Sequence, residues 1–208
     1  YRKTWQNKAV LRAVYKDYYR RMVKQLNPGP TLELGAGSGQ LREHLRDVVL
    51  TDIQMAPWLD AIVNAQVLPF RNACFENIVM LDVLHHVENP LQFFAEAARV
   101  LKSGGQIVML EPAITPLSSL FYRYLHPESV DMGQDPFVQT AANPERNPYE
   151  ANQAIPTLYF RRHRAKFEQR YPDFQLHMVR NLSLFAYPLS GGYRRWSLMP
   201  AFLVRPLL

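Results

Sequence analysis

A glycine-rich turn between a short apolar strand and a helix constrains this chain more than any other stretch. The run Thr31–Leu41 reads Thr-Leu-Glu-Leu-Gly-Ala-Gly-Ser-Gly-Gln-Leu, with glycines at alternate positions 35, 37 and 39. Glycine tolerates positive φ and lets a ligand approach the backbone without meeting a Cβ. Amides at the start of the following helix favour a polar or anionic group. We therefore expect a nucleotide-like ligand over the first strand-to-helix turn of a parallel α/β sheet.

The glycine spacing separates this turn from the dinucleotide fingerprint G-x-G-x-x-G. Counted from Gly35, the third glycine would fall at Gln40, but it stands at Gly39, and Glu33 precedes Gly35 by two residues. The run resembles motif I, E/D-x-G-x-G-x-G, of the class I S-adenosylmethionine (SAM) methyltransferases. For this motif alone, an ordinary tight turn is the alternative. The resemblance implies that the turn holds the methionine part of SAM through Glu33, Gly35, Ala36, Gly37 and Gly39.

Length and cysteine content bound the kind of protein. The 208 residues are long enough for a sizeable core and predict a single domain, 1–208. The lone cysteine, Cys74, excludes an internal disulfide and a cysteine zinc cluster, and it fits a reducing, cytoplasmic location. No segment reaches the roughly 18 consecutive apolar residues that a transmembrane helix needs. Because the chain begins at Tyr1 and ends on an apolar run, we expect it to be truncated or to use that run at an interface.

The net charge of +6 is concentrated in two basic clusters, within residues 1–25 and 161–170. Such clusters can meet nucleic acid or anionic lipid head groups, but they are more often the solvated faces of helices. No nucleic-acid-binding motif accompanies them, so a nucleic-acid partner is not expected. Weak peripheral contact with a membrane stays open.

The segments on either side of the glycine turn predict a helix and a second strand. Residues 7–26 carry apolar side chains at helical spacing, and we expect residues 1–30 to form an N-terminal helical cap over the cleft. Val48–Asp52 is an apolar run ending in an acid, as expected of a buried strand. In the family that this chain resembles, an acid there grips the ribose, which Asp52 matches, followed by Ile53. A strand-end aspartate that caps a turn is the alternative.

Asn64–Phe70 resembles the family's D-A-x-x-L-P-F segment after the third strand, where the acid meets the adenine amino group. Asn64 replaces that acid. Its amide oxygen can still accept a hydrogen bond, but without the charge that strengthens such contacts. The resemblance implies that Ala65 packs beside the adenine. Trp58–Ala61, just upstream, suggests a short helix.

The fourth expected strand, Asn77–Leu81, leads into Asp82-Val-Leu-His-His-Val-Glu-Asn-Pro90. This stretch resembles D-x-L-H-H-V/L-x-D/N-P of the methyltransferase type 11-like subgroup, which implies that Leu81 and Asp82 face the cofactor. His85 and His86 raise the question of a metal. Adjacent histidines point in different directions on a strand or helix, and no acid or histidine follows at ligand spacing, so no metal site is expected.

Beyond this point the elements become harder to assign. Residues 90–101 predict a helix and residues 106–112 a fifth strand. Residues 112–160 hold seven prolines and are long for a connection, so we expect a lid that forms the acceptor pocket. Residues 158–170 predict a basic helix and 174–180 a sixth, edge strand. The seventh strand is assigned either to residues 182–187 or to sequence beyond residue 208.

The expected fold is therefore α/β, with a Rossmann-like, seven-stranded, mainly parallel sheet, helices on both faces and a lid after the fifth strand. The resemblance implies a SAM-dependent methyltransferase, and we expect a small-molecule or sugar-like acceptor methylated at a hydroxyl. The candidate bases are His85, His86 and His126, followed by Glu111 and Tyr122.

Two other functions stay open. One is a non-catalytic binding or scaffold protein on the SAM-binding fold. The other is an NAD(P)-dependent oxidoreductase, against which Gln40 and the lack of a Tyr-x-x-x-Lys pair both argue. The sequence does not predict an oligomeric state.

Overall fold

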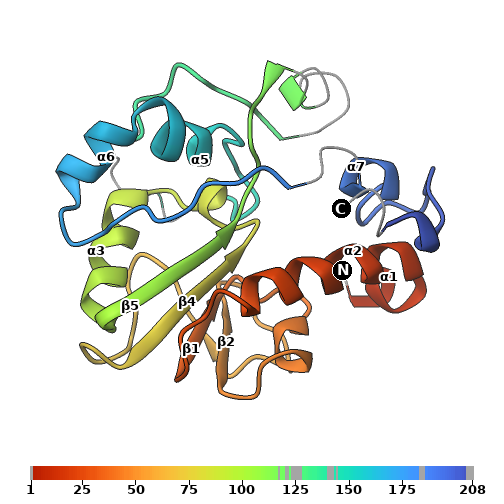
Figure 1. The fold of residues 1–208 in the computed structure, drawn as a ribbon, viewed down its shortest axis with the longest axis horizontal. Coiled ribbons are helices and arrows are strands. Elements are labelled where there is room, and N and C mark those ends of the chain that lie inside the picture. Colours follow the sequence, from red (N-terminus) through yellow and green to blue (C-terminus); the bar gives the residue numbers. More distant parts are fainter. Residues whose placement is uncertain are drawn as a thin grey trace.

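A computed structural model describes residues 2–116, 118–119, 122, 128–139, 143, 145–182 and 186–204. Within them, five parallel strands form one sheet in the order β3-β2-β1-β4-β5 (Figure 1). The strands are β1 (Thr31–Leu34), β2 (Val48–Asp52), β3 (Ala61–Ile62), β4 (Phe75–Leu81) and β5 (Leu101–Leu110). The chain adds β2 and β3 on one side of β1 and then crosses to add β4 and β5 on the other side. Ligands are expected where this order switches, at the carboxyl ends of β1 and β4.

The helices and single turns connect and cover these strands. At the N-terminus, α1 (Arg2–Asn7) and α2 (Ala9–Val23) take the place of the single helix expected over residues 7–26. The helix α3 (Pro90–Val100) begins with proline at its first position, as the sequence predicts. The remaining helical elements are η1 (Gln40–Glu43), η2 (Leu84–His86), α5 (Ile155–Thr157), the π-helical turn η3 (Leu158–Arg162), α6 (Arg164–Arg170), α7 (Ala186–Ser190) and η4 (Ala201–Leu203).

Both faces of the sheet are covered by helices, as predicted. On one face, side chains of β1 and β4 such as Leu32 and Ile78 pack with Phe93 and Phe94 of α3 and with the helices of residues 155–170. On the other, Val79 of β4 packs with α2 and with the C-terminal helices. The alternation of side chains along each strand therefore divides the core into two layers.

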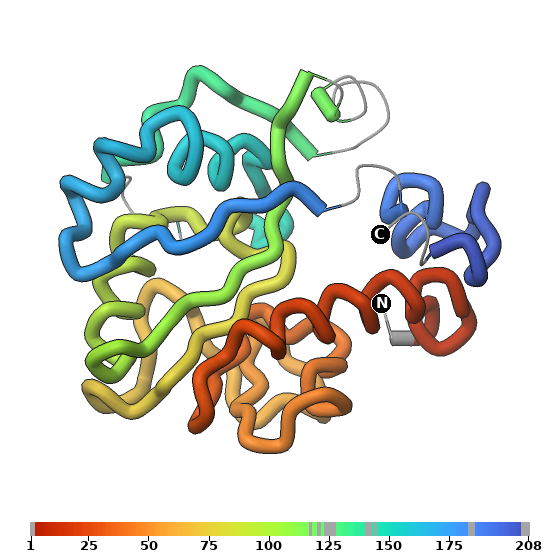
Figure 2. Tube along the Cα trace, viewed as in Figure 1, coloured from red at the N-terminus to blue at the C-terminus, as the bar shows by residue number. Residues whose placement is uncertain are grey.

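The two ends of the described chain meet beside the sheet (Figure 2). α7 and η4 pack on α2, and the Lys8 Nζ donates hydrogen bonds to the backbone carbonyls of Gly192, Arg194 and Trp196 at 2.7–2.8 Å. The side-chain ammonium group of Lys8 thus holds a C-terminal loop against the N-terminal helices.

The seven-stranded expectation is not met in the described residues. Residues 174–180 were predicted to form the sixth strand, but they have no regular secondary structure and pair with no described strand. Period-two alternation decides which side chains are exposed, whereas pairing also requires a neighbouring edge in register. Residues 186–190 are helical, and the rest of the alternative seventh strand at 183–185 lies outside the described residues.

Two short helices expected near the glycine turn are also absent. Only eight residues separate Gly39 from the start of β2, so the chain returns to the sheet after the single 3-10 turn η1. Trp58 lies in a turn, and its indole Nε1 donates to the Gly37 carbonyl at 2.9 Å. The following residues enter β3, whose pairing with β2 replaces the helix.

Among the described residues, no helix combines the length and apolar character needed to cross a membrane.

Candidate functional site

A large cleft opens at the carboxyl ends of the central strands. Its volume is about 2790 Å³, above the roughly 300–1,000 Å³ of a pocket for one small ligand, because it also extends along β5 as far as Gly104. Nine of the residues predicted to bind a cofactor line it: Gly35, Ala36, Gly37, Asp52, Ile53, Asn64, Ala65, Leu81 and Asp82. Glu33 and Gly39, also predicted, do not line it.

The three glycines of the turn have different tasks, although all have positive φ. A Cβ on Gly35 would lie 2.4 Å from Val83, and one on Gly39 would lie 2.6 Å from Trp58. A Cβ on Gly37 would meet only the Gly35 carbonyl, at 3.9 Å, and would otherwise enter the open cleft. Gly35 and Gly39 therefore permit close packing, whereas Gly37 leaves the space that a ligand needs to approach the backbone.

Asp52 links the end of β2 to this turn. Its Oδ2 accepts a hydrogen bond from the Gly37 amide, and its Oδ1 accepts one from the Gln54 amide, both at 2.9 Å. Each carboxylate oxygen retains a lone pair on the cleft side. The group can therefore accept a further bond at each oxygen, which matches the two vicinal hydroxyls of a ribose.

Glu33 lies under the turn and faces α2. It is fully buried, and neither carboxylate oxygen has a hydrogen-bonding partner of good geometry among the described residues. Burial raises the pKa of Glu33 to about 8, although the nearby Tyr19 hydroxyl opposes part of this rise. The structure thus places Glu33 behind the cleft rather than in it, and the carboxyl is mostly protonated at neutral pH.

Asn64 stands after β3, on the rim. Its Oδ1 accepts hydrogen bonds from the backbone amide and from Nε2 of Gln66, at 2.9 and 3.2 Å. The sequence analysis assigned this oxygen to the adenine amino group, but local turn formation already uses both lone pairs. Within the described contacts, the group left for a ligand is the Nδ2 donor, which suits a ring nitrogen.

Asp82 follows β4 with φ +57°, a conformation that only a few non-glycine residues adopt. Its amide donates to the Leu110 carbonyl at 2.9 Å, which ties it to the end of β5. Burial raises the pKa of Asp82 to about 7. The positive charge of His85 opposes this rise, and the negative charges of Glu111 and Glu128 add to it. Asp82 thus lies in a region rich in carboxylates.

Glu111, just after β5, organises the turn η2. Its Oε1 accepts from the amides of Val83 and Leu84 at 2.9 and 2.7 Å, and its Oε2 lies 2.7 Å from His85 Nδ1. Since both oxygens are engaged, Glu111 is a positioning residue and not a free base. It fixes the His85 ring, which is 3% exposed.

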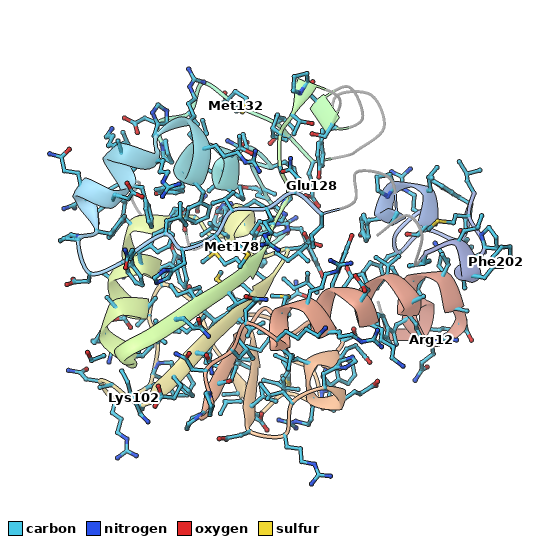
Figure 3. The ribbon with its side chains drawn as sticks, viewed as in Figure 1. Arg12, Lys102, Glu128, Met132, Met178 and Phe202 are labelled. Carbon is cyan, nitrogen blue, oxygen red and sulfur yellow. The ribbon has the colours of Figure 1, made fainter. Side chains whose placement is uncertain are left out.

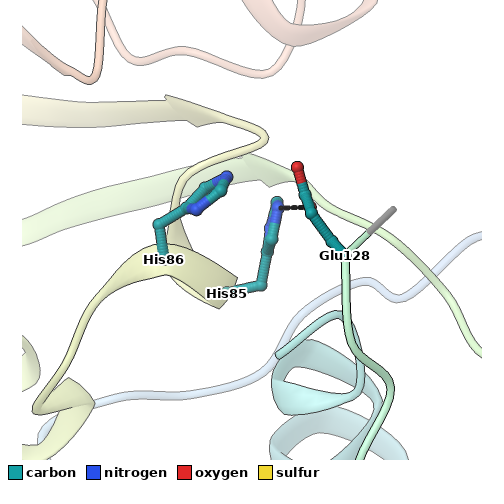
Figure 4. Close-up of side chains that lie close together, drawn as sticks. All are labelled: His85, His86 and Glu128. Atoms are coloured by element: carbon teal, nitrogen blue, oxygen red, sulfur yellow. Dashed lines mark ion pairs between the residues drawn. The ribbon is translucent and has the colours of Figure 1, made fainter. Parts of the chain in front are cut away.

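The rings of His85 and His86 lie close together, with centroids 4.2 Å apart. The sequence predicts that these adjacent histidines diverge, as on a strand or helix. They occupy the 3-10 turn η2, and both rings nevertheless lean toward Glu128 (Figure 4). Glu128 Oε2 is 3.6 Å from His85 Nε2.

The two imidazoles have opposite pKa shifts. Burial alone would lower the pKa of His85, but the hydrogen bond with Glu111 and the nearby carboxylate of Glu128 outweigh it and raise the pKa to about 10. The pKa of His86 is lowered, first by burial and then by the charge on His85. His126, the third predicted catalytic histidine, lies outside the described residues.

The insertion after β5 supplies the second wall of this region (Figure 3). Arg146 Nη1 donates to the His86 carbonyl at 2.7 Å, and the Asn152 amide donates to the His85 carbonyl at 3.0 Å. Glu128, Arg146 and Gln153 of this wall were not predicted. No local pattern marks them, because they reach the site only through the docking of the insertion on η2.

Tyrosines form the third wall, which sequence reasoning also missed. They come from α2 and from the C-terminal segment, and Tyr122 of the insertion lines the cleft as well. Burial raises the pKa of Tyr15 and of Tyr187, so their hydroxyls stay protonated. The lining tyrosines of α2 and the C-terminal segment are Tyr15, Tyr18, Tyr19, Tyr187 and Tyr193.

Comparison with known proteins agrees with this geometry. Residues 32–109 match a family model described as a methyltransferase domain. An uncharacterised protein of Methanocaldococcus jannaschii is 30% identical over 104 residues, which are 46% of this chain and 51% of that protein. A demethylmenaquinone methyltransferase of Tropheryma whipplei is 38% identical over 65 residues, 29% of this chain and 27% of that protein. The chain thus spans about half or less of the curated relatives that it matches.

Among solved structures, a SAM-dependent methyltransferase from Thermotoga maritima has a similar fold. The TM-score is 0.50 at 22% identity, and the match covers 55% of this chain and 59% of that one. The likeness is one of fold and leaves nearly half of this chain unmatched.

Proposed function

We propose that this chain, whose residues 32–109 match a methyltransferase domain, is a class I SAM-dependent methyltransferase that methylates a hydroxyl of a small-molecule acceptor. One observation carries the proposal. A single cleft has the glycine turn and Asp52 on one wall and a cluster of histidine and carboxylate groups on another. The first wall suits the cofactor of this family, and the second suits a polar acceptor.

In this proposal the cofactor wall binds SAM in three parts. The turn around Gly37 holds the methionine part, and the Asp52 carboxylate accepts hydrogen bonds from the ribose hydroxyls. Ile53, Asn64 and Ala65 surround the adenine, with Asn64 donating through Nδ2. The open space at Gly37 and the unused lone pairs of Asp52 support this fit. When bound, SAM supplies a methyl group already activated by a positively charged sulfur.

The task left to the chain is to align the acceptor, exclude water and receive the proton that a hydroxyl loses as its oxygen takes the methyl group. His85 and His86 lie near Asp82 at the end of β4, with Glu128 facing them from the insertion. We propose that this polar wall handles the hydroxyl. The N-terminal cap of residues 1–30 and the insertion of residues 112–160 would enclose the acceptor.

The tyrosine wall supports a small acceptor over a macromolecule. Aromatic faces with protonated hydroxyls can pack against a ring or sugar and hydrogen-bond to it, whereas a nucleic-acid site needs basic side chains along a groove. Tyr15, Tyr18 and Tyr187 stay uncharged at neutral pH, and the basic side chains that line the same cleft are interspersed with acidic ones.

The test is a methyl-transfer assay with SAM labelled in its methyl group. The acceptor panel should contain phenols, quinols, sugars and primary amines, and it should include demethylmenaquinone because one relative is named for it. We expect label in a methyl ether of a hydroxyl acceptor and no transfer by an Asp52→Ala variant. Binding of S-adenosylhomocysteine with no transfer to any acceptor would contradict the enzyme and favour a binding protein. Transfer to amines alone would contradict the hydroxyl acceptor.

A further inference from the structure

Three potential metal-binding side chains converge at the acceptor end of the cleft. One ligand atom each of His85, His86 and Glu128 can be chosen so that all three lie within 4.8 Å of one another. Figure 4 shows both rings on η2 and the carboxylate reaching them from the insertion. Two segments about forty residues apart in sequence thus meet at a point, and they do so beside the proposed acceptor.

The spacing of the donor atoms fits an ion between them better than direct contact. His85 Nε2 and Glu128 Oε2 are 3.6 Å apart, beyond the usual length of a hydrogen bond. Two ligands bound to Zn²⁺ at about 2.1 Å with a tetrahedral angle lie about 3.4 Å from each other. The observed separation is therefore close to that of two ligands of one tetrahedral ion.

Each ligand is oriented by a partner behind it. Glu111 holds His85 through Nδ1 at 2.7 Å, which leaves Nε2 to point toward Glu128. His86 Nδ1 faces the Glu150 carbonyl at 3.4 Å, so its Nε2 is also left as a lone pair. Gln153 Nε2 donates to the Glu128 carboxylate. Outer partners of this kind fix the tautomer and direction of metal ligands.

Gln153 adds an independent sign of a missing polar partner. The residue is 2% exposed, and its Oε1 is buried without a hydrogen-bonding partner among the described residues. A buried amide oxygen left unpaired is costly, so such an atom marks a place where a water or ion-bound ligand completes the network. This oxygen belongs to the side chain that holds Glu128.

The local charge also favours a cation. The carboxyl groups of Asp82, Glu111 and Glu128 all line the cleft beside the imidazole pair. A bound divalent cation would displace the proton of His85 and face these groups in its place.

We propose that His85, His86 and Glu128 bind a divalent cation of the zinc type, with one coordination position open to the cleft. Two imidazoles and one carboxylate with an open position are a donor set that Zn²⁺ uses in catalytic sites. The role of the ion rests on the proposed function. An acceptor hydroxyl bound at the open position would lose its proton more readily, because the cation stabilises the oxyanion.

The test measures metal binding separately from catalysis. The tag-free full chain is treated with chelator, dialysed, and titrated with Zn²⁺, Co²⁺ and Mg²⁺ by calorimetry. We expect one Zn²⁺ per chain with a micromolar or lower Kd, and Mg²⁺ at least about 100-fold weaker because the donor set is rich in nitrogen. Co²⁺ should give the strong visible absorption of a four-coordinate ion, a readout on the unmodified chain.

Matched variants locate the site. Glu128→Gln and His86→Gln should each raise the Zn²⁺ Kd at least about 100-fold, and Gln153→Leu should raise it about tenfold through the lost outer contact. Glu168→Gln and His177→Asn remove the same chemical groups from exposed positions outside the cluster and should leave the Kd unchanged.

Two results would overturn the metal site. One is a folded, chelator-treated chain that takes up no Zn²⁺. The other is a Zn²⁺ Kd that stays unchanged in Glu128→Gln, His86→Gln and Gln153→Leu. S-adenosylhomocysteine binding is measured on the same samples, so the two proposals can fail independently. Cofactor binding and methyl transfer without metal would leave the methyltransferase proposal standing, whereas Zn²⁺ binding without methyl transfer would leave only the metal site.

Discussion

The cofactor wall and the acceptor wall of the cleft are built in different ways. The cofactor wall joins the ends of neighbouring strands, as in the bond from the Gly37 amide to Asp52 fifteen residues later. The acceptor wall, meaning the histidine–carboxylate cluster and the tyrosines of α2 and the C-terminal segment, joins remote segments. Glu128 approaches His85 from the insertion, and Lys8 ties the C-terminal segment to the N-terminal helices. The first depends on backbone conformation at the strand ends, and the second depends on docking. Substitutions should therefore affect the two walls differently.

The largest effect is expected at Gly35, where the turn allows neither a side chain nor a change of φ. Gly35→Ala should lower the free energy of unfolding by about 2–5 kcal/mol, since left-handed backbone costs about 1–2 kcal/mol and a Cβ overlapping Val83 adds about 1–3 kcal/mol. Gly104→Ala is the matched control, because its φ is +78° and its Cβ would meet nothing within 4 Å. It should cost only about 1–2 kcal/mol. Equal losses in urea denaturation would show that packing under the turn is unimportant.

Glu33 should make stability fall as pH rises. Its carboxyl has a pKa near 8 in the folded chain, above the ordinary value of 4.5, so the folded state binds the proton more tightly. The contribution of Glu33 to stability is therefore greatest below about pH 4.5. It is lost progressively up to about pH 8, by at most about 5 kcal/mol. Glu33→Gln keeps the shape and removes the titration. The unfolding free energies of the two proteins should diverge from pH 5 to pH 8 in favour of glutamine, whereas parallel curves would contradict a buried neutral carboxyl.

Lys8 tests the docking of the chain ends. Lys8→Met should destabilise residues 186–204 by about 1–2 kcal/mol, because three carbonyls lose a charged donor in a partly exposed setting. Hydrogen exchange should quicken there while β1 and β4 keep their protection. Lys16→Met, at an exposed position of the same helix, should change neither. Faster exchange throughout the sheet would show that the two walls are not separate.

The smallest effect is expected at Asn64. Asn64→Asp keeps an oxygen to accept the Gln66 amide and replaces the Nδ2 donor by a second acceptor. The Kd for S-adenosylhomocysteine should change by less than about fivefold, because this group lies on an exposed rim. A change of a hundredfold, measured by calorimetry, would mean that Asn64 is central to adenine binding.

The same division explains what the sequence could predict. Parallel strands that end in Asp52 and Asp82 must bring these groups to one edge, so the sheet and most of the cofactor wall followed from short motifs. Glu33 was predicted to bind the cofactor, but side-chain alternation along β1 turns it toward α2 and away from the cleft. The adenine contact of Asn64 stays a prediction, and motif reading could not show that the Asx turn with Gln66 engages its oxygen.

The acceptor wall gave no comparable signal. Glu128 and Gln153 are ordinary polar residues in a proline-rich stretch, and only tertiary docking gives them a role. The convergence of His85 and His86 depends on a 3-10 turn that hydrophobic periodicity does not reveal. Residues 174–180 alternate like a strand, yet their sequence holds no information about a partner edge.

The central claim, that the glycine turn and Asp52 bind SAM, is tested most directly by titrating the chain with S-adenosylhomocysteine in a calorimeter. We predict one-to-one binding with a micromolar Kd and no response to NAD. Asp52→Ala should weaken binding at least about 100-fold, since charge-assisted hydrogen bonds contribute about 1.5–3 kcal/mol each. Asp47→Ala, an exposed aspartate before β2, should leave the Kd unchanged. Folded protein that fails to bind, or binding that Asp52→Ala leaves intact, would contradict the claim.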